Sequence, residues 1–365
     1  MTTSTLQNGV SAQRNTARLA GWVVLAIVLI ALPFVIGQAG QSWVRIANFA
    51  LLYVMLALGL NITVGFAGLL DLGYIAFYAV GAYTWALLAS PHFGLHLPFW
   101  LVIPIAVAVA GMFGLLLGIP TLKLKGDYLA IVTLGFCAII GIFLRNLNAP
   151  FNITNGPQGI NRIDSFQVGD FNFGRASTIF DMRFTGPEKY YFLLLFMTLL
   201  IVLVSSRLQN SRVGRALEAV REDEIAAKAM GINIRNVKLL AFATGAMFAG
   251  LAGSMFASMQ GFVSPESFSL PESISVLCMV VLGGMGHIPG VIIGAIILAI
   301  LPEFLRAIVV PVQQTLFGDV IVDPEGIRML LFGLAMVLVM LFRPAGLWPS
   351  AVRKRELSTS KGEGR

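Results

Sequence analysis

Residues 44–74 read VRIANFALLYVMLALGLNITVGFAGLLDLGY, and they decide which class of fold to expect. The part up to Val64 is an apolar run about as long as the roughly 20 residues that an α-helix needs to cross a bilayer. The part that follows contains three glycines and Asp71, which interrupt the helical pattern. Interrupted backbone at membrane depth must face protein or water, because hydrocarbon cannot satisfy its N–H and C=O groups. The stretch therefore predicts a membrane-spanning helix followed by a break.

Apolar runs of similar length recur along the chain. Of its 365 residues, 57% are hydrophobic and only 12% are charged, whereas soluble domains have roughly 45–50% apolar and about 25% charged residues. This composition excludes a soluble globular enzyme. The predicted fold is an all-α polytopic membrane protein with about ten transmembrane helices, some of them broken at glycine-rich segments. The predicted spans lie near 19–37, 44–64, 72–90, 98–119, 128–146, 190–206, 239–260, 273–286, 288–309 and 328–343.

The basic residues predict the orientation of these spans, because cytoplasmic loops carry an excess of Lys and Arg. With the N-terminus inside, both termini are cytoplasmic, and the transmembrane domain at 19–343 lies between an N-terminal tail and a C-terminal tail at 344–365. The same spread of charge over membrane-flanking loops argues against nucleic-acid binding. Four segments are then cytoplasmic and hold 17 of the 25 Lys and Arg, namely 1–18, 120–127, 207–238 and 343–365.

A long connection, residues 147–189, is predicted to be a periplasmic loop. Its Gly, Pro and Asn residues predict turns, and the alternation of apolar and polar residues from Phe166 to Phe173 predicts short strands or a lid. A solvated spacer is the alternative. Contact with an external partner is favoured, because an unstructured loop of this length is uncommon in a compact protein. The candidate contact residues are Thr154, Asn155, Gly156 and Gln158.

The cytoplasmic loop 207–238 contains the densest cluster of charge in the chain. From Gly214 to Gly231 it is predicted to form one helix, because glycine commonly follows the last helical residue. An apolar stripe runs from Leu217 to Ala229 among the charged residues. A short amphipathic helix of this kind either lies on the membrane or docks into a groove of a soluble partner. Docking is favoured, because its acidic residues oppose adsorption to anionic lipid.

Motifs for the common catalytic chemistries are missing from the sequence. It contains no G-x-x-x-x-G-K-[ST] phosphate loop, no H-E-x-x-H zinc motif and no G-x-S-x-G nucleophile motif. The segment from Gly284 to Gly290 has the spacing G-x-G-x-x-x-G with Pro289 inside it, which does not fit a dinucleotide-binding turn. The three histidines lie in predicted connections without a metal-ligand pattern. We therefore expect neither an enzyme nor a metal or cofactor site in this chain.

Two glycine-rich breaks make transport the leading class of function, because broken helices and polar residues mark transport pathways in membranes. The break near 65–73 carries Asp71, which either belongs to the pathway or caps the next helix. The break near 283–290 follows a run that is too short for a full crossing, as in a broken or re-entrant element. The candidate residues for the pathway or gate are Asn61, Gly65, Gly68, Asp71, Gly73, Tyr74, Gly283, Gly284, Gly286 and His287.

Several of these segments occur in the same order in one known family. The joint order is more specific than any single segment, and the likeness extends over most of residues 44–349. They resemble the LivM-type permease subunit of branched-chain amino acid ABC transporters. The segments are GFAGLLDLGY at 65–74, TNGPQG at 154–159, the charged loop with KLLAF at 238–242, AGLAG at 249–253, GGMGHIPG at 283–290 and RPAGLW at 343–348.

The resemblance implies a multi-pass subunit of the bacterial inner membrane that moves leucine, isoleucine and valine by alternating access. It implies four partners besides membrane lipid: a sister permease of the LivH type, two cytoplasmic ABC ATPase subunits and a periplasmic amino-acid-binding protein. ATP and Mg²⁺ would be bound by the ATPase subunits. The charged loop would be a coupling helix for the ATPase, with the candidate residues Gly214, Arg215, Glu218, Ala219, Arg221, Glu222, Asp223, Ala226, Ala227 and Gly231.

Three alternatives to this interpretation stay open. Urea-type permeases share much of the pattern, so the substrate is urea, another amide or another amino acid in the first alternative. A non-transporting membrane scaffold or receptor would show no substrate flux. A proton-coupled secondary transporter would need ionisable groups within the spans, and the predicted spans offer almost none. Within the favoured interpretation, we expect backbone N–H groups at the two breaks to meet the carboxylate of the substrate.

Overall fold

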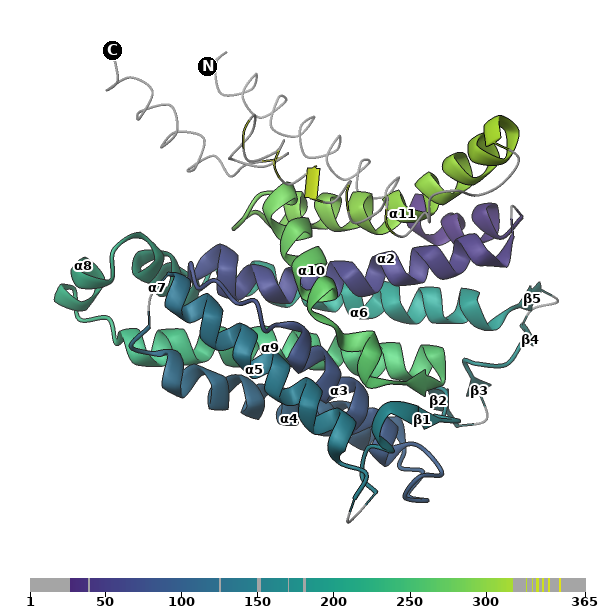
Figure 1. The fold of residues 1–365 in the computed structure, drawn as a ribbon, viewed down its shortest axis with the longest axis horizontal. Coiled ribbons are helices and arrows are strands. Elements are labelled where there is room, and N and C mark those ends of the chain that lie inside the picture. The colour runs from purple at the N-terminus through teal and green to yellow at the C-terminus, as the bar shows by residue number, and fades with distance from the viewer. Residues whose placement is uncertain are drawn as a thin grey trace, which may run out of the picture.

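A computed structural model describes residues 27–317, except 39, 125, 150–151, 170 and 180–181, together with single positions between 326 and 348. Most of its long helices lie side by side along the longest axis of the molecule (Figure 1). The predicted span 328–343 falls largely outside the described residues, and the predicted span 19–37 is described from residue 27 onward. Each of the eight predicted spans between 44 and 309 overlaps a helix, so the polytopic helical class is confirmed.

Most of the helices follow one another with short connections, whereas a long connection joins α5 to α6. Among the described residues, five segments are long and apolar enough to cross a membrane: Gln41–Phe66, Phe99–Thr121, Asp127–Asn146, Gly186–Gln209 and Ile234–Gln260. The helices are Ile27–Gln38, α2 (Gln41–Leu60), α3 (Ile75–Leu88), α4 (Phe99–Thr121), α5 (Asp127–Asn146), α6 (Gly186–Gln209), α7 (Arg212–Glu222), α8 (Glu224–Ala229), α9 (Ile234–Gln260), α10 (Leu270–Gly283) and α11 (Ile288–Phe317). Three short helical turns complete the set: η1 (Asn61–Phe66), η2 (Gly156–Gln158) and η3 (Pro265–Phe268).

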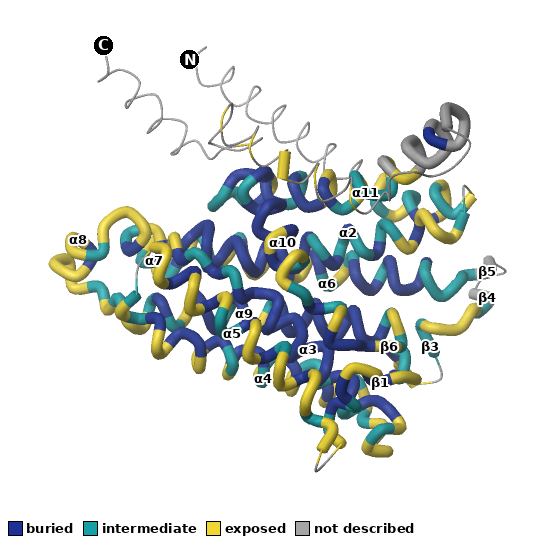
Figure 2. The backbone as a smooth tube through the Cα atoms, in the orientation of Figure 1, coloured by how far each residue is buried: buried dark blue, intermediate teal, exposed yellow. Residues whose placement is uncertain are grey.

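Helices α3 and α9 form the centre of the molecule, where most residues are buried (Figure 2). Small residues let their backbones approach closely. A Cβ atom on Gly253 of α9 would lie 2.1 Å from the carbonyl oxygen of Tyr78 in α3, and one on Gly250 would lie 2.4 Å from Cβ of Ala110 in α4. Such close packing holds helices together in lipid, where the hydrophobic effect gives no preference for protein contacts over lipid contacts.

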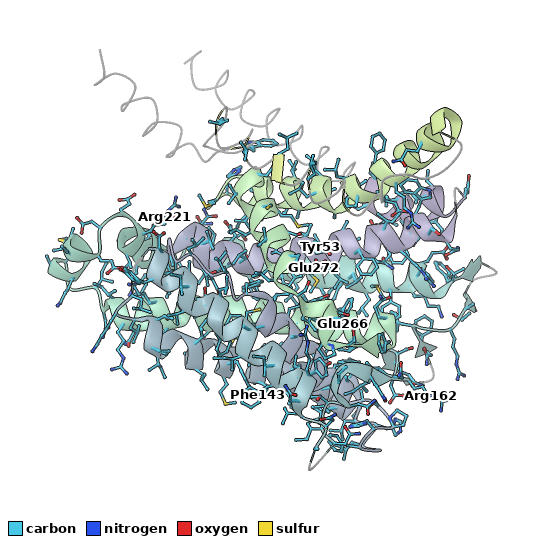
Figure 3. The ribbon with its side chains drawn as sticks, in the orientation of Figure 1. Tyr53, Phe143, Arg162, Arg221, Glu266 and Glu272 are labelled. Atoms are coloured by element: carbon cyan, nitrogen blue, oxygen red, sulfur yellow. The ribbon has the colours of Figure 1, made fainter. Side chains whose placement is uncertain are left out.

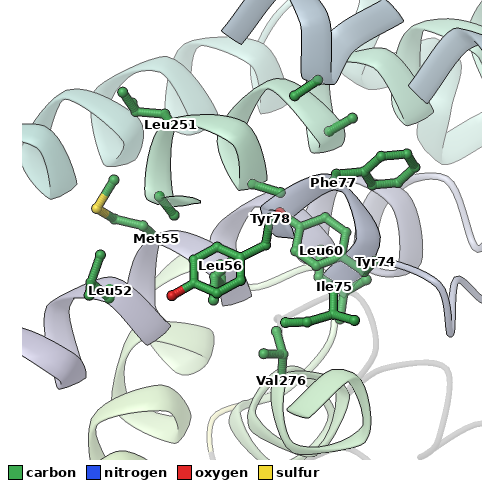
Figure 4. Packing of buried hydrophobic residues seen from close by; sticks show 14 of the residues in the cluster. Leu52, Met55, Leu56, Leu60, Tyr74, Ile75, Phe77, Tyr78, Leu251 and Val276 are labelled. Atoms are coloured by element: carbon green, nitrogen blue, oxygen red, sulfur yellow. The ribbon is translucent and has the colours of Figure 1, made fainter. Parts of the chain in front are cut away.

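Large apolar side chains fill the space between α2, α3, α9 and α10. Figure 4 shows Leu56 and Leu60 of α2 beside Tyr78 of α3 and Val276 of α10. On α4, α5 and α6, by contrast, many large apolar side chains are exposed, Phe143 of α5 among them. Contiguous exposed apolar surface of this kind is expected where a helix faces lipid or a membrane partner.

The predicted short strands of the 147–189 connection are present. They form two-residue and three-residue ladders at the end of the molecule opposite α7 and α8 (Figure 1). Tyr190 anchors the connection, because its hydroxyl accepts a hydrogen bond of 3.0 Å from the amide of Phe166 and bonds to Ser258 of α9. The strands pair as β1 (Ile160–Asn161) with β6 (Phe262–Val263), β2 (Gln167–Val168) with β3 (Phe171–Asn172), and β4 (Ser177–Ile179) with β5 (Met182–Phe184).

Candidate functional site

Three segments that are far apart in the sequence meet at the end of the molecule where α7 lies. They are η1, the last turn of α7, and the turn between α10 and α11. Nη1 of Arg221 donates a hydrogen bond of 2.5 Å to the carbonyl of Gly65. Oδ1 of Asn61 accepts one of 2.8 Å from the amide of Gly286, and Nε2 of Gln209 donates to the Gly286 carbonyl at 3.3 Å. We call Asn61, Gly65, Arg221 and Gly286 the junction; Figure 3 shows Arg221 at this end.

Helix α2 reaches the junction through the π-helical turn η1. The amide of Ala67 donates to the carbonyl of Ile62, and this wider turn occurs mostly as a single-turn interruption at functional sites. Glycine is required at position 65, because a Cβ atom there would lie 2.0 Å from Oδ1 of Asn61 and 2.6 Å from the amide nitrogen of Gly286. The glycines at this predicted break therefore allow two backbone segments to touch.

Two further glycines make room for the Arg221 side chain. Gly68 has a φ of +69° and Gly286 a φ of +83°, which other residues adopt only with strain. A Cβ atom on Gly68 would lie 2.8 Å from Cγ of Arg221, and one on Gly286 would lie 3.1 Å from its Nη1. The guanidinium of Arg221 thus hydrogen-bonds to the first break and lies beside the second.

The loop that carries Arg221 is folded as two helices, so the prediction of a single helix from Gly214 to Gly231 is wrong. Asp223 has an extended backbone with φ −154° and ψ 111°, and it separates α7 from α8. Its carboxylate accepts hydrogen bonds from the amides of Ile225 and Ala226, so it caps α8. Aspartate favours such a cap over a position within a helix, because its short side chain competes for backbone N–H groups. Gly231, with a φ of +83°, follows α8 as predicted.

An ion pair links α8 to the central helix α9. Nζ of Lys238 lies 2.6 Å from Oε1 of Glu224, and the Lys238 side chain is only 2% exposed. A buried charge needs a partner, and removing one member of such a pair typically costs about 3–5 kcal/mol of stability. The ion pair therefore fastens α8 to the first turn of α9.

The predicted coupling residues divide between the interior and the surface. Gly214 and Ala227 are buried, and a Cβ atom on Gly214 would lie 2.3 Å from the carbonyl of Gln209. Ala219 is half-buried. Two apolar side chains of the same loop, Ile225 and Met230, are also exposed, by 78% and 83%. The exposed members are Arg215, Glu218, Arg221, Glu222, Asp223, Ala226 and Gly231.

Asp71 is fully buried in the segment between η1 and α3. Its Oδ1 accepts a hydrogen bond of 2.9 Å from the amide of Gly73, and its Oδ2 has no partner among the residues that the structure describes. It does not cap α3, because that helix is preceded by Tyr74 and receives no side-chain cap. The Tyr74 hydroxyl instead donates to the carbonyl of Gly245 in α9 at 3.1 Å. The cap interpretation of Asp71 is therefore wrong.

Side chains from two other helices hold the same segment. Leu72 donates its amide to Oγ1 of Thr133 in α5 at 3.0 Å and accepts a bond of 2.6 Å from Oγ of Ser273 in α10. A Cβ atom on Gly73 would lie 2.1 Å from the carbonyl of Thr133. The first break is thus fixed between α5, α9 and α10.

Residues of the second break, between α10 and α11, form hydrogen bonds with one another. His287 donates its amide to the Gly284 carbonyl at 3.2 Å and accepts a bond of 3.3 Å from the amide of Gly290 on its Nδ1. A Cβ atom on Gly283 would lie 2.4 Å from the Gly290 carbonyl, so the two helices that flank the turn touch there. The amide of Gly286 is bonded to Asn61. These N–H groups are occupied in this conformation, so they present no site for a substrate carboxylate.

The predicted periplasmic contact residues build a turn. Thr154 is buried and its hydroxyl donates to the Leu144 carbonyl at 2.8 Å, and Gly156 is buried beside it. Asn155 has a φ of +60° and donates from Nδ2 to the Gly159 carbonyl. Of the four candidates, Gln158 is the one with an exposed side chain.

Sequence reasoning missed a polar pair in the middle of the molecule. The hydroxyl of Tyr53 lies 3.0 Å from Oε2 of Glu272, and Figure 3 shows both residues near the middle of the long axis. Tyr53 is half way along the span Gln41–Phe66. Glu272 lies half-buried in the first turn of α10. The shortness of the predicted span 273–286 was a signal that could have pointed to this pair. A 14-residue helix covers only about 21 Å of a roughly 30 Å core, so one of its ends lies within the membrane.

No group of three or more His, Cys, Asp or Glu side chains that could hold a metal ion occurs within the described part of the chain. The site is therefore built from backbone contacts, one guanidinium and buried polar side chains. This arrangement can transmit a movement of α7 to two helix breaks; it offers no nucleophile with an adjacent base.

Comparisons with known proteins identify the family. Residues 42–340 match the family model described as "Branched-chain amino acid transport system / permease component". The chain is 42% identical over 94% of its length to the "High-affinity branched-chain amino acid transport system permease protein LivM" of Escherichia coli, of which it covers 77%. It is 27% identical to the "Probable branched-chain amino acid transport permease protein LivM" of Methanocaldococcus jannaschii, over 74% of each chain.

The chain also resembles a second kind of permease. It is 25% identical to the "High-affinity branched-chain amino acid transport system permease protein LivH" of Escherichia coli, over 81% of this chain and 90% of the relative. No solved structure matches the chain significantly. The family model covers most of the helices described above, including both breaks and the loop that carries Arg221. This protein belongs to the permease family of branched-chain amino acid transport systems.

Proposed function

We propose that this protein is the LivM-type membrane subunit of an ABC importer that moves leucine, isoleucine and valine across the bacterial inner membrane. The relatives bear names of branched-chain amino acid permeases, and the sequence has no phosphate loop of its own. The energy then comes from ATP hydrolysis, with Mg²⁺, on partner subunits. The observation that carries the mechanism is the junction, where a residue of the charged loop hydrogen-bonds to the first helix break and lies beside the second.

The partners follow from the same interpretation. Similarity to both LivM and LivH relatives supports a paired permease in which this chain meets a sister of the LivH type. One of the two ATPase subunits would dock on the exposed side of α7 and α8, and a periplasmic binding protein would deliver the substrate at the opposite end. The orientation follows the positive-inside rule, since this loop holds the largest share of basic residues. Both termini are then cytoplasmic.

The geometry supports alternating access in which α7 and α8 move together and displace the helices that they contact. A displacement of α7 breaks or forms the Arg221 contact with Gly65, and the ion pair of Lys238 with Glu224 carries the same displacement to α9. Packed helices of this kind switch between discrete arrangements, because close-packed interfaces do not deform continuously.

Uptake by the reconstituted importer tests this function. The complex of both permeases and the ATPases, in proteoliposomes with ATP inside and the binding protein outside, should accumulate labelled leucine but not labelled urea. Uptake of urea instead would assign the chain to the amide permeases. Assembly of the complex without ATP-dependent flux of either solute would favour the scaffold or receptor, and uptake driven by a proton gradient without ATP would favour the secondary transporter.

A further inference from the structure

Three cavities follow one face of α2 from its outer end to the middle of the span. The outermost has a volume of about 210 Å³ and is lined by Arg45 and Asn48, among others. Two further cavities, of about 200 Å³ each, are both lined by Tyr53 and Glu272. Phe49 lines all three. Residues four apart on a helix share a face, so this face connects the outer end with the centre of the membrane. We call this face the α2 route.

The outer cavity contains a buried acceptor. Asn48 is only 1% exposed, and its Nδ2 donates a hydrogen bond of 2.9 Å to the carbonyl of Pro187 in α6. This bond fixes the orientation of the amide, and its Oδ1 has no partner among the described residues although it is fully shielded. A buried acceptor without a donor costs stability, which a bound ligand with an N–H group would offset.

The two inner cavities place a carboxylate among apolar walls. Oε2 of Glu272 accepts from the Tyr53 hydroxyl at 3.0 Å, while Leu52, Leu56 and Met279 contribute apolar lining. Glu303 of α11 lines one of the two cavities as a second acidic side chain. These volumes are below the roughly 300–1,000 Å³ of clefts for drug-sized ligands, so they suit a small solute.

Helix capping does not account for Glu272. It occupies the third position of α10, from which a glutamate often bonds back to the amide of the cap residue. The cap of α10, Ser269, takes part in no side-chain cap bond, and Glu272 instead contacts Tyr53 of α2. A carboxylate at mid-membrane depth is costly and marks a substrate pathway by default.

We propose that the α2 route binds the ammonium group of the transported amino acid, first at Oδ1 of Asn48 and then at the Glu272 carboxylate, which Tyr53 orients. The aliphatic side chain of the substrate then lies against Phe49, Leu52 and Met279. An ammonium group with an apolar side chain is the combination that these walls recognise, whereas urea carries neither. The inference rests on the proposed function, because it assigns the step at which this subunit holds the substrate.

The first test is uptake by the reconstituted importer with single substitutions. Glu272→Gln keeps the size of the side chain and removes its charge, so leucine uptake should fall on the order of tenfold, the worth of one charge-assisted hydrogen bond. Tyr53→Phe should raise KM for uptake several-fold. Glu266→Gln is the matched control, because Glu266 is an exposed carboxylate in η3 close by, and it should transport normally. ATPase stimulation by the binding protein should persist in all three variants.

The second test detects the substrate in the cavity. Ser275 lines a cavity beside Glu272, so a Ser275→Cys variant with Cys137→Ser and Cys278→Ser reports access of a thiol reagent. Leucine during turnover should slow the labelling when Glu272 is present and should not when Glu272→Gln is added. If Glu272→Gln does not assemble, Tyr53→Phe takes its place in this comparison.

The outcomes separate the two levels of the proposal. Wild-type complex that fails to take up leucine would overturn the proposed function itself. Wild-type uptake together with normal uptake by Glu272→Gln, or with leucine protection that is independent of Glu272, would overturn the α2 route and leave the importer function intact. Loss of uptake in Glu266→Gln to the same extent would also overturn it, because the effect would then not depend on a carboxylate that lines the α2 route.

Discussion

Arg221 of α7 donates a hydrogen bond of 2.5 Å to the backbone carbonyl of Gly65 in η1, although the two residues are separated by 156 positions in the sequence. The same guanidinium lies next to Gly286, because a Cβ atom added to that glycine would be 3.1 Å from Nη1 of Arg221. One side chain of the charged loop therefore bonds to one glycine-rich break and lies beside the other. Because this contact joins the surface proposed for the motor to the ends of two membrane helices, it is the first place to test coupling.

Replacing Arg221 with alanine should uncouple transport from ATP hydrolysis. The substitution removes a charge-assisted hydrogen bond worth about 1.5–3 kcal/mol, so leucine uptake should fall on the order of tenfold or more while the complex still assembles. Leucine uptake and ATPase activity in proteoliposomes measure the coupling, and size-exclusion chromatography measures the assembly of the complex. Arg207→Ala is the control, because Arg207 is an exposed arginine in the last turn of α6, outside the proposed docking surface. Equal uptake by both variants would remove Arg221 from the coupling path.

Gly65→Ala should destabilise the protein and impair transport. The added methyl group would lie 2.0 Å from Oδ1 of Asn61, so η1 or the turn at Gly286 must shift. Overpacking of this kind costs about 1–3 kcal/mol, which thermal unfolding in detergent would show as a lower Tm. Gly135→Ala in α5 is the control, since nothing lies within 4 Å of a Cβ atom there. A Tm for Gly65→Ala at or above that of the control would contradict the close approach.

Lys238→Met should lower stability more than the loss of packing explains. It leaves Glu224 without the ammonium group that lies 2.6 Å away, and the expected cost is about 3–5 kcal/mol. The double variant Lys238→Met with Glu224→Gln should recover part of this loss, because the carboxylate that lost its ammonium neighbour is then uncharged. A double-mutant cycle on unfolding by denaturant measures the coupling. Additive effects of the two substitutions would show that the pair does not fasten α8 to α9.

Asp71→Ala should lower leucine uptake, whereas Asp71→Asn should keep it near the wild-type level. Alanine removes the acceptor for the Gly73 amide and leaves that donor buried, at a cost of about 1–3 kcal/mol, while asparagine retains an oxygen for the same bond. The fraction of assembled complex and its initial uptake rate measure both variants. A loss of uptake in Asp71→Asn with normal assembly would show that the carboxyl group itself, rather than the turn, is required.

The helical spans were predictable from local sequence, and so were the residues at the breaks. Gly65, Gly68 and Gly286 were recognised as interruptions, and each proves to allow a close contact. The prediction of a single loop helix was wrong at Asp223, because helix propensity alone does not reveal where a capping side chain competes with the helix. Glu272 was missed because its contact with Tyr53 depends on the packing of α10 against α2, which no local sequence pattern reveals.

The sequence by itself determined the class of protein and the positions of its helices and breaks, because the length of an apolar run is matched to the thickness of a bilayer and a glycine acts on its own backbone. It also placed the charged loop beside the membrane through its basic residues. Only the tertiary structure decided that Arg221 reaches Gly65 and that Glu272 faces Tyr53. Such contacts arise from how helices distant in sequence pack against one another, and that packing depends on the shapes of all their facing side chains.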